Sequence, residues 1–336
     1  MKNLTPVLAS LVLLAHGLFA STSGSTYAVG TCRPSLPSFS SVGAAITGVP
    51  AGATILVCPG TYEENELDIA QPLTLEGVTS ADNAMVLIHL AAPASYLVSV
   101  VGTGPVNISN IEFGGVTSSG TGIQYSNASG TLNHVTVCSL PNTCPETSDL
   151  NPEVSVIVND GSSQSVSIES SSFLASNFLP AIQTSVTSGT LTFTVQGNSI
   201  TGAPTGISLQ GGTATISGNF IDGGGVGIAS SGGATISGNT IVNTSTSGIS
   251  SSTGDTVTSN KLIGNATAVS ATGAGTFSHN TIMNSTVGID LGCNSGVATS
   301  NNFINTGTGF NNVPTSFGTA TNGFFGVPTV KGTICP

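Results

Sequence analysis

Basic and aromatic side chains are scarce in this sequence. It contains no tryptophan, and lysine and arginine together number four in 336 residues. Only 6% of the residues are charged, against roughly 25% in an ordinary soluble domain. A nucleic-acid groove needs clustered lysine and arginine, so this composition excludes nucleic acid as a partner. It equally excludes long helices with charged, solvent-exposed faces.

Small and β-forming residues take the place of the charged ones. Glycine alone accounts for 44 residues, and the formal net charge at pH 7 is −11. The apolar content of 38% is large enough to build a core, and isoleucine, valine and threonine favour strands. These features argue against plain disorder and predict an all-β chain with many tight turns.

The first twenty residues have the pattern of an export signal. Lys2 supplies the positive charge, and residues 4–20 (LTPVLASLVLLAHGLFA) supply the apolar stretch. We predict a signal peptide at residues 1–20, with cleavage after Ala28 as the alternative. The proline and glycine inside the stretch argue against a retained membrane span, and no second apolar run of membrane length follows. The expected location is therefore secreted, extracellular or at the cell surface, with no transmembrane segment after signal removal.

Six cysteines follow the signal, an even number that predicts disulfides in an exported protein. Their order along the chain favours pairing of neighbours: Cys32 with Cys58, Cys138 with Cys144, and Cys293 with Cys335. Each such bridge would clip an end or a loop of the fold. A zinc site is the weaker interpretation, because no CxxC pair is present and histidine is scarce.

Internal repeats are the most informative feature of the chain. An asparagine recurs at intervals of 20 or 21 residues, at Asn198, Asn219, Asn239, Asn260, Asn280 and Asn301. Apolar residues recur with it, three residues before the asparagine, two residues after it, and again about nine residues after it. Glycine, serine and threonine, which are typical of turns, separate these positions.

Each repeat therefore carries three short β-prone pieces that cannot bury their apolar residues alone. Stacking the repeats about 4.8 Å apart would form three parallel sheets around one continuous core. The asparagines fit an inner turn where side-chain amides of successive coils bond as a ladder. We predict an all-β, right-handed, single-stranded parallel β-helix with coils of 20–21 residues. Leucine-rich repeats share the period, but segments such as residues 223–235 lack helix formers and the leucine pattern.

The two ends of such a stack need covers. Phe39, Val42, Ile46 and Val49 follow helical spacing, so a short N-terminal capping helix is expected over residues 39–47. We divide the chain into a signal peptide (1–20), an N-terminal segment with the capping helix (21–52), the parallel β-helix (53–316) and a C-terminal cap (317–336).

Residues 52–77 read GATILVCPGTYEENELDIAQPLTLEG. This segment resembles the opening coil of secreted bacterial right-handed β-helix proteins of the pectin-lyase-like superfamily. The ISGN-x-I units are similar to the parallel β-helix repeats of that superfamily, including those of NosD-like proteins. The resemblance spans nearly the whole mature chain and implies the fold. It implies no single activity, because the superfamily includes lyases, hydrolases, esterases, epimerases and adhesins.

The catalytic motif sets of those families are absent. The sequence has no counterpart of the calcium-binding carboxylates and basic residue of pectate lyases. It also lacks the NTD, DD, GHG and RIK motifs of polygalacturonases and the DPHD-like site of the epimerases. Residues 60–64 (GTYEE) match the first esterase motif, GxYxE, but the later aspartate and arginine motifs are missing. We therefore assign no catalytic, cofactor-binding or metal-binding residue, and no cofactor.

Histidines and one acidic run are the remaining isolated candidates for a functional site. His89, His134 and His279 could each act as a general base, but His279 takes a turn position that small residues hold elsewhere, without a partner carboxylate. The run Glu63, Glu64, Glu66 and Asp68 lacks the spacing of a calcium loop and is expected to form a solvated turn.

Two rows of hydroxyl side chains flank the first apolar position of each repeat. One row holds Thr194, Thr215, Thr235, Thr256 and Thr276, and the other holds Ser217, Ser237, Thr258, Ser278 and Thr299. Strand alternation places both rows on one outer face, which could bind a glycan or ordered water. The alternative is that threonine and serine are simply good exposed strand residues.

The function expected from these observations is noncatalytic: polysaccharide binding or adhesion by a secreted or surface β-helix, with a polysaccharide or cell-surface glycan as partner. One alternative is a polysaccharide lyase or glycoside hydrolase acting on acidic plant or algal polysaccharide. Its candidate residues lie in the irregular coils between residues 106 and 182: Glu112, Glu146, Asp149, Glu153, Asp160 and Glu169. A purely structural extracellular spacer is the second alternative.

Overall fold

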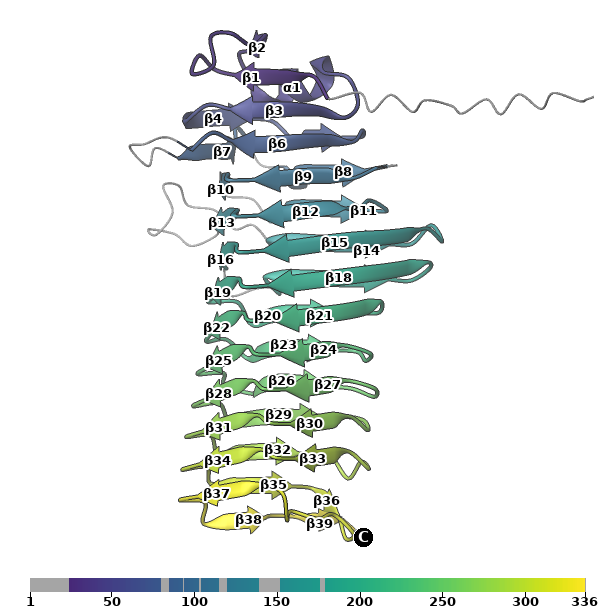
Figure 1. Ribbon diagram of the computed structural model, residues 1–336, viewed down its shortest axis with the longest axis vertical. Coiled ribbons are helices and arrows are strands. Elements are labelled where there is room, and N and C mark those ends of the chain that lie inside the picture. Colours follow the sequence, from purple (N-terminus) through teal and green to yellow (C-terminus); the bar gives the residue numbers. More distant parts are fainter. Residues whose placement is uncertain are drawn as a thin grey trace, which may run out of the picture.

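The chain forms one long stack of coils in the computed structural model (Figure 1), with the N-terminal end of the described chain and the C-terminal end at opposite ends of the stack. The structure describes residues 24–79, 85–92, 94–102, 104–114, 120–138, 152–175 and 179–335. The predicted signal peptide at residues 1–20 lies outside these residues.

Three long sheets, here named A, B and C, run along the stack, and every pairing between their strands is parallel. Sheet A consists of β2 (Ser38–Phe39), β1 (Thr26–Val29), β3 (Ala53–Val57), β6 (Leu73–Gly77), β9 (Val106–Ser109), β12 (Gly130–Asn133), β15 (Ser163–Glu169), β18 (Thr190–Gln196), β21 (Thr213–Ser217), β24 (Thr235–Ser237), β27 (Thr256–Thr258), β30 (Thr276–Ser278) and β33 (Val297–Thr299).

Sheet B consists of β4 (Gly60–Glu64), β7 (Val86–Leu90), β10 (Glu112–Gly114), β13 (Thr136–Cys138), β16 (Ser172–Leu174), β19 (Ser199–Thr201), β22 (Phe220–Asp222), β25 (Thr240–Val242), β28 (Lys261–Ile263), β31 (Thr281–Met283), β34 (Asn302–Ile304) and β37 (Gly323–Phe325).

Sheet C consists of β5 (Leu67–Ile69), β8 (Tyr96–Val101), β11 (Thr121–Ser126), β14 (Val154–Val158), β17 (Ile182–Val186), β20 (Thr205–Leu209), β23 (Val226–Ser230), β26 (Ser247–Ser251), β29 (Thr267–Ala271), β32 (Val287–Asp290), β35 (Thr308–Asn311) and β38 (Thr329–Lys331). Two further short strands, β36 (Val313–Pro314) and β39 (Ile334–Cys335), pair with each other.

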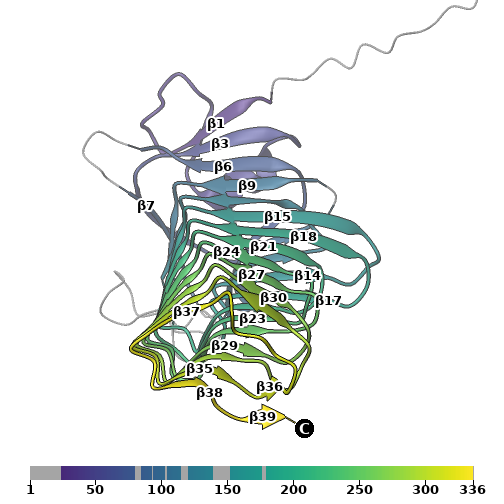
Figure 2. The same ribbon diagram turned by 60° about the horizontal axis from the view of Figure 1, so that its bottom comes forward.

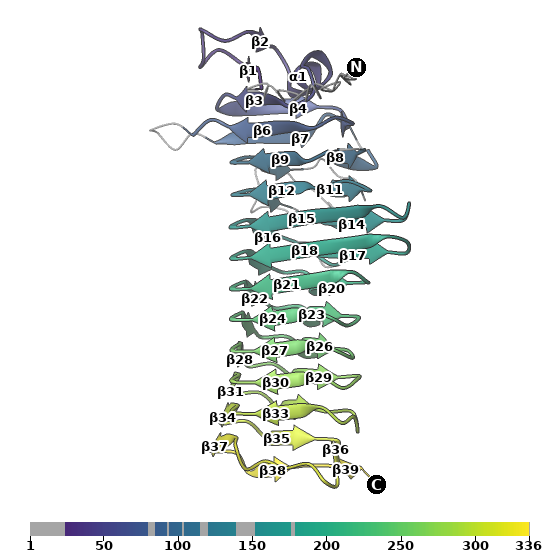
Figure 3. The same ribbon diagram turned by 45° about the vertical axis from the view of Figure 1, so that its right-hand side comes forward.

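This arrangement confirms the predicted all-β, parallel β-helix with three sheets, and it excludes leucine-rich repeats. From β3 to β35 each coil contributes one strand to each sheet, and the tilted view in Figure 2 shows these coils stacked on one another. The three apolar columns predicted from the repeats all point into the core, and their members are buried from Val195 to Phe310. Strands β15 and β18 are seven residues long and extend beyond their neighbours (Figure 3).

The predicted N-terminal helix is present as α1 (Val42–Gly48), and it begins later than expected. Ser41 is extended and its hydroxyl accepts a hydrogen bond from the N–H of Ala44 at 3.2 Å, so it caps the helix and stops it from reaching back to Phe39. Phe39 instead belongs to β2, with its ring 6.0 Å from that of Tyr27. α1 is the one helix in the described part of the chain, and its seven residues are far too few to cross a membrane.

The predicted asparagine ladder is confirmed, and it continues one coil further, to Asn322. In each step an asparagine Nδ2 donates to the Oδ1 of the next asparagine; the Asn239–Asn260 step measures 3.0 Å. The same Nδ2 also donates to a backbone carbonyl of the preceding coil, such as that of Ile216 at 3.0 Å. The six predicted asparagines are all buried, so the ladder satisfies polar groups that would otherwise be costly inside the turn.

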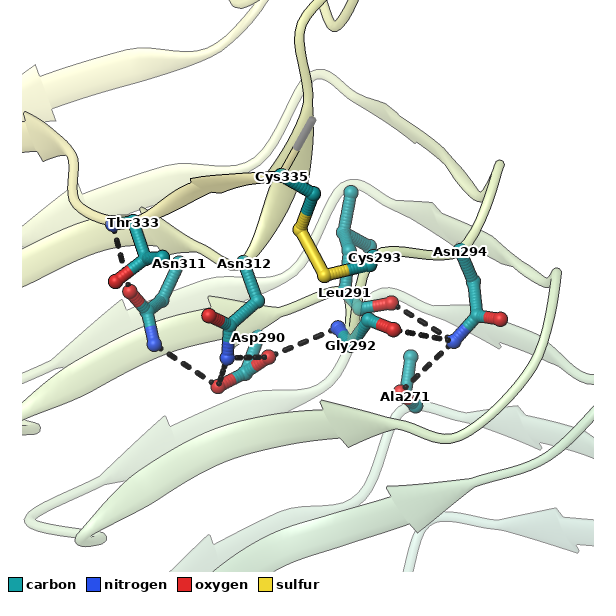
Figure 4. Close-up of a disulfide and its surroundings, with 10 residues drawn as sticks. All are labelled: Ala271, Asp290, Leu291, Gly292, Cys293, Asn294, Asn311, Asn312, Thr333 and Cys335. Carbon is teal, nitrogen blue, oxygen red and sulfur yellow. Dashed lines mark hydrogen bonds between the residues drawn. A yellow bond between two sulfur atoms is a disulfide. The ribbon is translucent and has the colours of Figure 1, made fainter.

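Two of the three predicted disulfides are present among the described residues. Cys32 is bonded to Cys58, and Cys293 to Cys335. Cys138 is also disulfide-bonded, and its predicted partner, Cys144, lies outside the described residues. Figure 4 shows the Cys293–Cys335 bridge tying β39 to the turn that follows β32. Close to it, the carboxylate of Asp290 accepts hydrogen bonds from the side chains of Asn311 and Asn312.

Cys335→Ser is expected to lower the free energy of unfolding by about 2–4 kcal/mol, because the bridge closes a long loop and limits the unfolded chain. The two cysteines are 42 residues apart in sequence. Urea unfolding under non-reducing conditions would measure the loss. Cys293→Ser should cost the same, and the double variant should cost no more than either one. A midpoint equal to that of the parent protein would contradict the expectation.

Candidate functional site

The described carboxylates among those proposed for an enzyme in the irregular coils do not gather at one place. Glu112 lies on the outer face of sheet B, in β10, whereas Glu169 lies on the outer face of sheet A, in β15. Asp160 is in the exposed turn after β14, where its Oδ1 accepts a hydrogen bond from the N–H of Ser162. Glu146 and Asp149 lie outside the described residues. The described members therefore form no acid–base pair across a groove.

The individual environments of these residues also give no sign of a catalytic role. Glu153 precedes β14 and is only 1% exposed, so its carboxylate is not presented on the surface. Glu169 accepts a hydrogen bond from the hydroxyl of Ser167 at 2.6 Å. The pKa of the Asp160 carboxyl is lowered by its hydrogen bonds to Ser162, and it stays ionised in neutral solution.

Burial on the sheet B face raises the pKa of Glu112 above its ordinary value of 4.5. The folded protein then holds this proton more tightly than the unfolded chain, so stability falls as the pH rises from 4.5 through the folded-state pKa.

Glu112→Gln is expected to remove that loss of stability. The variant should be more stable than the parent at pH 7, by less than about 1 kcal/mol because the group is half exposed, and no more stable than the parent near pH 4. Unfolding midpoints at the two pH values would check this. An equal gain at both values would show that the change acts through packing.

The acidic run in the first coil is only partly the solvated turn expected from the sequence. Glu64 is buried, and its two carboxylate oxygens accept hydrogen bonds from the N–H groups of Val42 (2.6 Å) and Gly43 (3.2 Å) at the start of α1. Glu66 accepts from the N–H of Ser95, and Asp68 from the hydroxyl of Tyr96. This hydrogen bond to Asp68 is the main reason why the pKa of Tyr96 is raised. The GTYEE motif thus joins the helix to the first coil.

The aspartates of the regular coils also hold the structure together. Asp255 is buried and accepts four hydrogen bonds, two from backbone N–H groups and two from serine hydroxyls. Asp222 accepts from the side chain of Asn243, and Asp290 from those of Asn311 and Asn312. No group of three or more histidine, cysteine, aspartate or glutamate residues that could hold a metal ion occurs within the described ranges.

The three candidate histidines differ in their surroundings. His134 and His279 are exposed and have positive φ angles of 53° and 57°, so they occupy left-handed turn positions, and His279 precedes Asn280 of the ladder. His89 lies on the outer face of β7, is buried, and is the register partner of Glu63 in β4. This neighbouring carboxylate and imidazole were missed in the sequence because the first coils lack the regular 20- to 21-residue spacing. Matching the strand pattern of residues 60–64 to that of residues 86–90 would have found them.

The outer surface of sheet A carries a continuous row of small side chains, all of them polar except the last. Register pairing links eleven strands in one column, whose members are Thr54, Thr74, Asn107, Thr131, Ser167, Thr194, Thr215, Thr235, Thr256, Thr276 and Val297. Strand geometry spaces its members about 4.8 Å apart. The predicted threonine row is thus the C-terminal part of a column that runs almost the whole length of the stack.

A second column runs beside the first, two residues further along each strand and therefore about 6.6 Å away. From β18 onward it consists of Gln196, Ser217, Ser237, Thr258, Ser278 and Thr299. We name these two columns from β18 to β33 the hydroxyl face. It carries no charged side chain. The five threonine hydroxyls from Thr194 to Thr276 make no hydrogen bond with another described residue, so they are available to a ligand.

Comparison with known proteins identifies the fold. Residues 154–316 match the family model described as the right handed beta helix region. The PL6 family polysaccharide lyase Pedsa3628 from Pseudopedobacter saltans superposes with a TM-score of 0.55 at 16% identity, covering 83% of this chain and 75% of that one. The periplasmic alginate epimerase AlgG gives a TM-score of 0.50 at 13% identity, with 84% and 76% covered. No curated protein sequence matches this chain.

Proposed function

We propose that this chain, a right-handed parallel β-helix protein of the pectin-lyase-like type, is a noncatalytic polysaccharide-binding protein that acts outside the cytoplasm. The observation that carries the proposal is the hydroxyl face. It offers an uncharged array of hydrogen-bonding groups along the stack axis, on a sheet that the parallel register keeps regular. An extended polysaccharide presents hydroxyl groups along its length and can match such an array with many weak bonds.

The state of the acidic residues supports binding over catalysis. Glu64, Glu66, Asp68, Asp222, Asp255 and Asp290 are engaged in hydrogen bonds within the fold. Glycoside hydrolysis needs two carboxyl groups that flank the same glycosidic bond. The described carboxylates of the irregular coils lie on different sheets and do not form such a pair. The disulfides support a location in an oxidising compartment.

One exposed aromatic side chain adds to this surface. Phe220 lies on the outer face of sheet B, beside the ladder turn that separates it from the hydroxyl face, and is 43% exposed. Aromatic rings are common platforms for the apolar faces of sugars.

The proposal is tested by measuring the binding of residues 21–336 to pectin, alginate and neutral glycans by affinity electrophoresis. Thr215→Val with Thr235→Val removes two hydroxyl groups from the hydroxyl face without changing its shape or charge, and it should weaken binding about tenfold, because each hydrogen bond contributes about 0.5–1.5 kcal/mol. The matched control is Ser250→Ala, on the outer face of sheet C, which should bind like the parent. Equal binding by the double variant, or no binding of any glycan by the parent, would overturn the proposal.

The register pairing of Glu63 with His89 favours a second candidate, an enzyme that acts on polysaccharide at the outer face of sheet B. Glu112 lies on the same face one strand further. Incubation of the same glycans with the protein, followed by mass spectrometry, would reveal soluble products. Products that are lost in both Glu63→Gln and His89→Gln would establish this candidate, and unchanged glycans would dismiss it.

A further inference from the structure

Sheet A stops one strand early at the C-terminal end of the stack. Sheets B and C continue after β34 and β35 with β37 and β38, whereas β33 has a neighbour on one side only. The chain between β36 and β37 passes the place where a further strand of sheet A would lie, without pairing there as a strand. One edge of sheet A is therefore left open within the described residues.

The hydrogen-bond pattern of the sheet shows what this edge offers. The N–H of Thr276 donates to the carbonyl of Asp255, and the N–H of Val297 donates in the same way to that of Gly275. By the alternation of a parallel ladder, the carbonyl of Gly296 and the N–H of Ala298 then point toward the missing strand. An open edge of this kind is a template for pairing with another extended segment.

A cavity of about 420 Å³ occupies the place of the missing strand. One wall is formed by residues 295–299, around β33, and the other by Pro314, Phe317 and the segment up to Thr321. That segment rejoins the stack only beyond the cavity, where Ser300 donates to the carbonyl of Thr321 and the Asn322 side chain donates to that of Ala298. Val297 is 55% exposed at the edge. None of the lining residues is charged.

A small side chain at the inward position of β33 adds to the empty space. Ala298 takes the inward position that Val195, Ile216, Ile236, Val257 and Phe277 fill in the preceding coils. Its single methyl group leaves room that those larger residues occupy elsewhere. A guest strand could place one apolar side chain over Ala298 and use the backbone groups of the edge on either side.

We propose that the cavity beside β33 binds an extended, uncharged peptide, which adds to sheet A as one more parallel strand. The backbone of the peptide donates to the carbonyl of Gly296 and accepts from the N–H of Ala298. Its apolar side chain packs over Ala298, and small hydroxyl residues on either side face outward. This is peptide recognition by strand addition, in which main-chain bonds provide affinity and a side-chain pocket provides selectivity. The site lies at the C-terminal edge of the hydroxyl face, with which it shares Val297 and Thr299, and it does not depend on the proposed polysaccharide.

A sheet A strand of this protein supplies the sequence of the peptide used as a probe. Residues 233–238 (GATISG) include β24, which fills the corresponding place after β21. The acetylated and amidated peptide Gly-Ala-Thr-Ile-Ser-Gly should bind with one-to-one stoichiometry in isothermal titration calorimetry. A control peptide with aspartate in place of isoleucine should not bind, because it would bury a charge in an uncharged cavity.

Ala298→Pro tests the edge directly. Proline removes the N–H that points to the guest, but this N–H takes no part in the ladder with β30, so the substitution suits an edge strand. Binding of the peptide should weaken at least tenfold, while the unfolding midpoint stays close to that of the parent. Ala298→Leu should also prevent binding, because it fills the cavity, and it should raise the unfolding midpoint.

The outcomes separate the possible occupants. Binding that Ala298→Pro does not weaken, or no binding of the peptide at millimolar concentration, would overturn the proposal. Protein dimers at high concentration that disappear in Ala298→Pro, without peptide binding, would also overturn it and assign the edge to a second copy of the chain. Ala298→Leu keeps the test valid if the proline variant fails to fold.

Discussion

Asn239→Ala is expected to lower the free energy of unfolding by about 2–5 kcal/mol, since each buried polar group left without a partner costs about 1–3 kcal/mol. Asn239 is fully buried. Its Oδ1 accepts hydrogen bonds from the backbone N–H and the side chain of Asn219, and its Nδ2 donates to Asn260. The variant breaks the ladder on both sides and leaves the N–H of Asn219 unpaired. Urea unfolding followed by circular dichroism would measure the loss.

The matched control is Asn302→Ala. Asn302 is exposed on the outer face of β34, and its side chain makes no hydrogen bond with another described residue. Its replacement should change the free energy of unfolding by less than about 0.5 kcal/mol. A loss at Asn302 as large as that at Asn239 would contradict the ladder as the source of stability. It would show instead that an asparagine outside the ladder contributes as much as one within it.

Asp255→Ala should destabilise the middle of the stack to a similar extent. The Asp255 carboxylate accepts from the N–H groups of Ala234 and Ser252, both at 2.8 Å, and from the hydroxyls of Ser230 and Ser251, both at 3.0 Å. Bonds to a charged acceptor contribute about 1.5–3 kcal/mol each, so removing this one group costs at least about 3 kcal/mol. Thermal unfolding of the variant would measure the loss as a lower midpoint.

Two further variants separate the effect of the Asp255 charge from that of its hydrogen bonds. Asp255→Asn keeps the size of the side chain and one carbonyl acceptor, so it should lose clearly less stability than Asp255→Ala. Glu63→Ala removes an exposed carboxylate and should leave the midpoint unchanged. If Asp255→Asn is as unstable as Asp255→Ala, the charge of the group is what the fold requires. If neither Asp255→Ala nor Asp255→Asn is destabilised, the four hydrogen bonds of Asp255 contribute nothing to stability.

Much of the fold could be predicted from local pattern. The 20- to 21-residue recurrence of Asn198 and its successors indicated both the coil length and the ladder, because a stack repeats the same contacts in every coil. The pairing of Cys32 with Cys58 and of Cys293 with Cys335 followed from their order along the chain, because a stack of coils keeps cysteines that are neighbours in that order close together in space. The start of α1 was misplaced because the spacing of Phe39 resembled a helix, while the cap at Ser41 decided the boundary.

The candidate site was less accessible to sequence reasoning. Glu63 and His89 are 26 residues apart, outside the regular period, so their pairing across β4 and β7 depends on how insertions shift the register. The buried position of Glu64 could not be inferred either, because it results from the packing of α1 over the first coil. The resemblance to pectin-lyase-like proteins implied the fold and left the activity open.

The sequence by itself determined the architecture, since a period of 20–21 residues with three apolar positions has only one efficient way to bury them. It also determined that hydroxyl groups line one outer face, because strand alternation follows from residue order alone. The tertiary structure decided which carboxylates are used inside the fold and where a strand of sheet A is missing. Those features depend on contacts between coils whose lengths differ, and on loops that leave the repeat, so no local pattern encodes them.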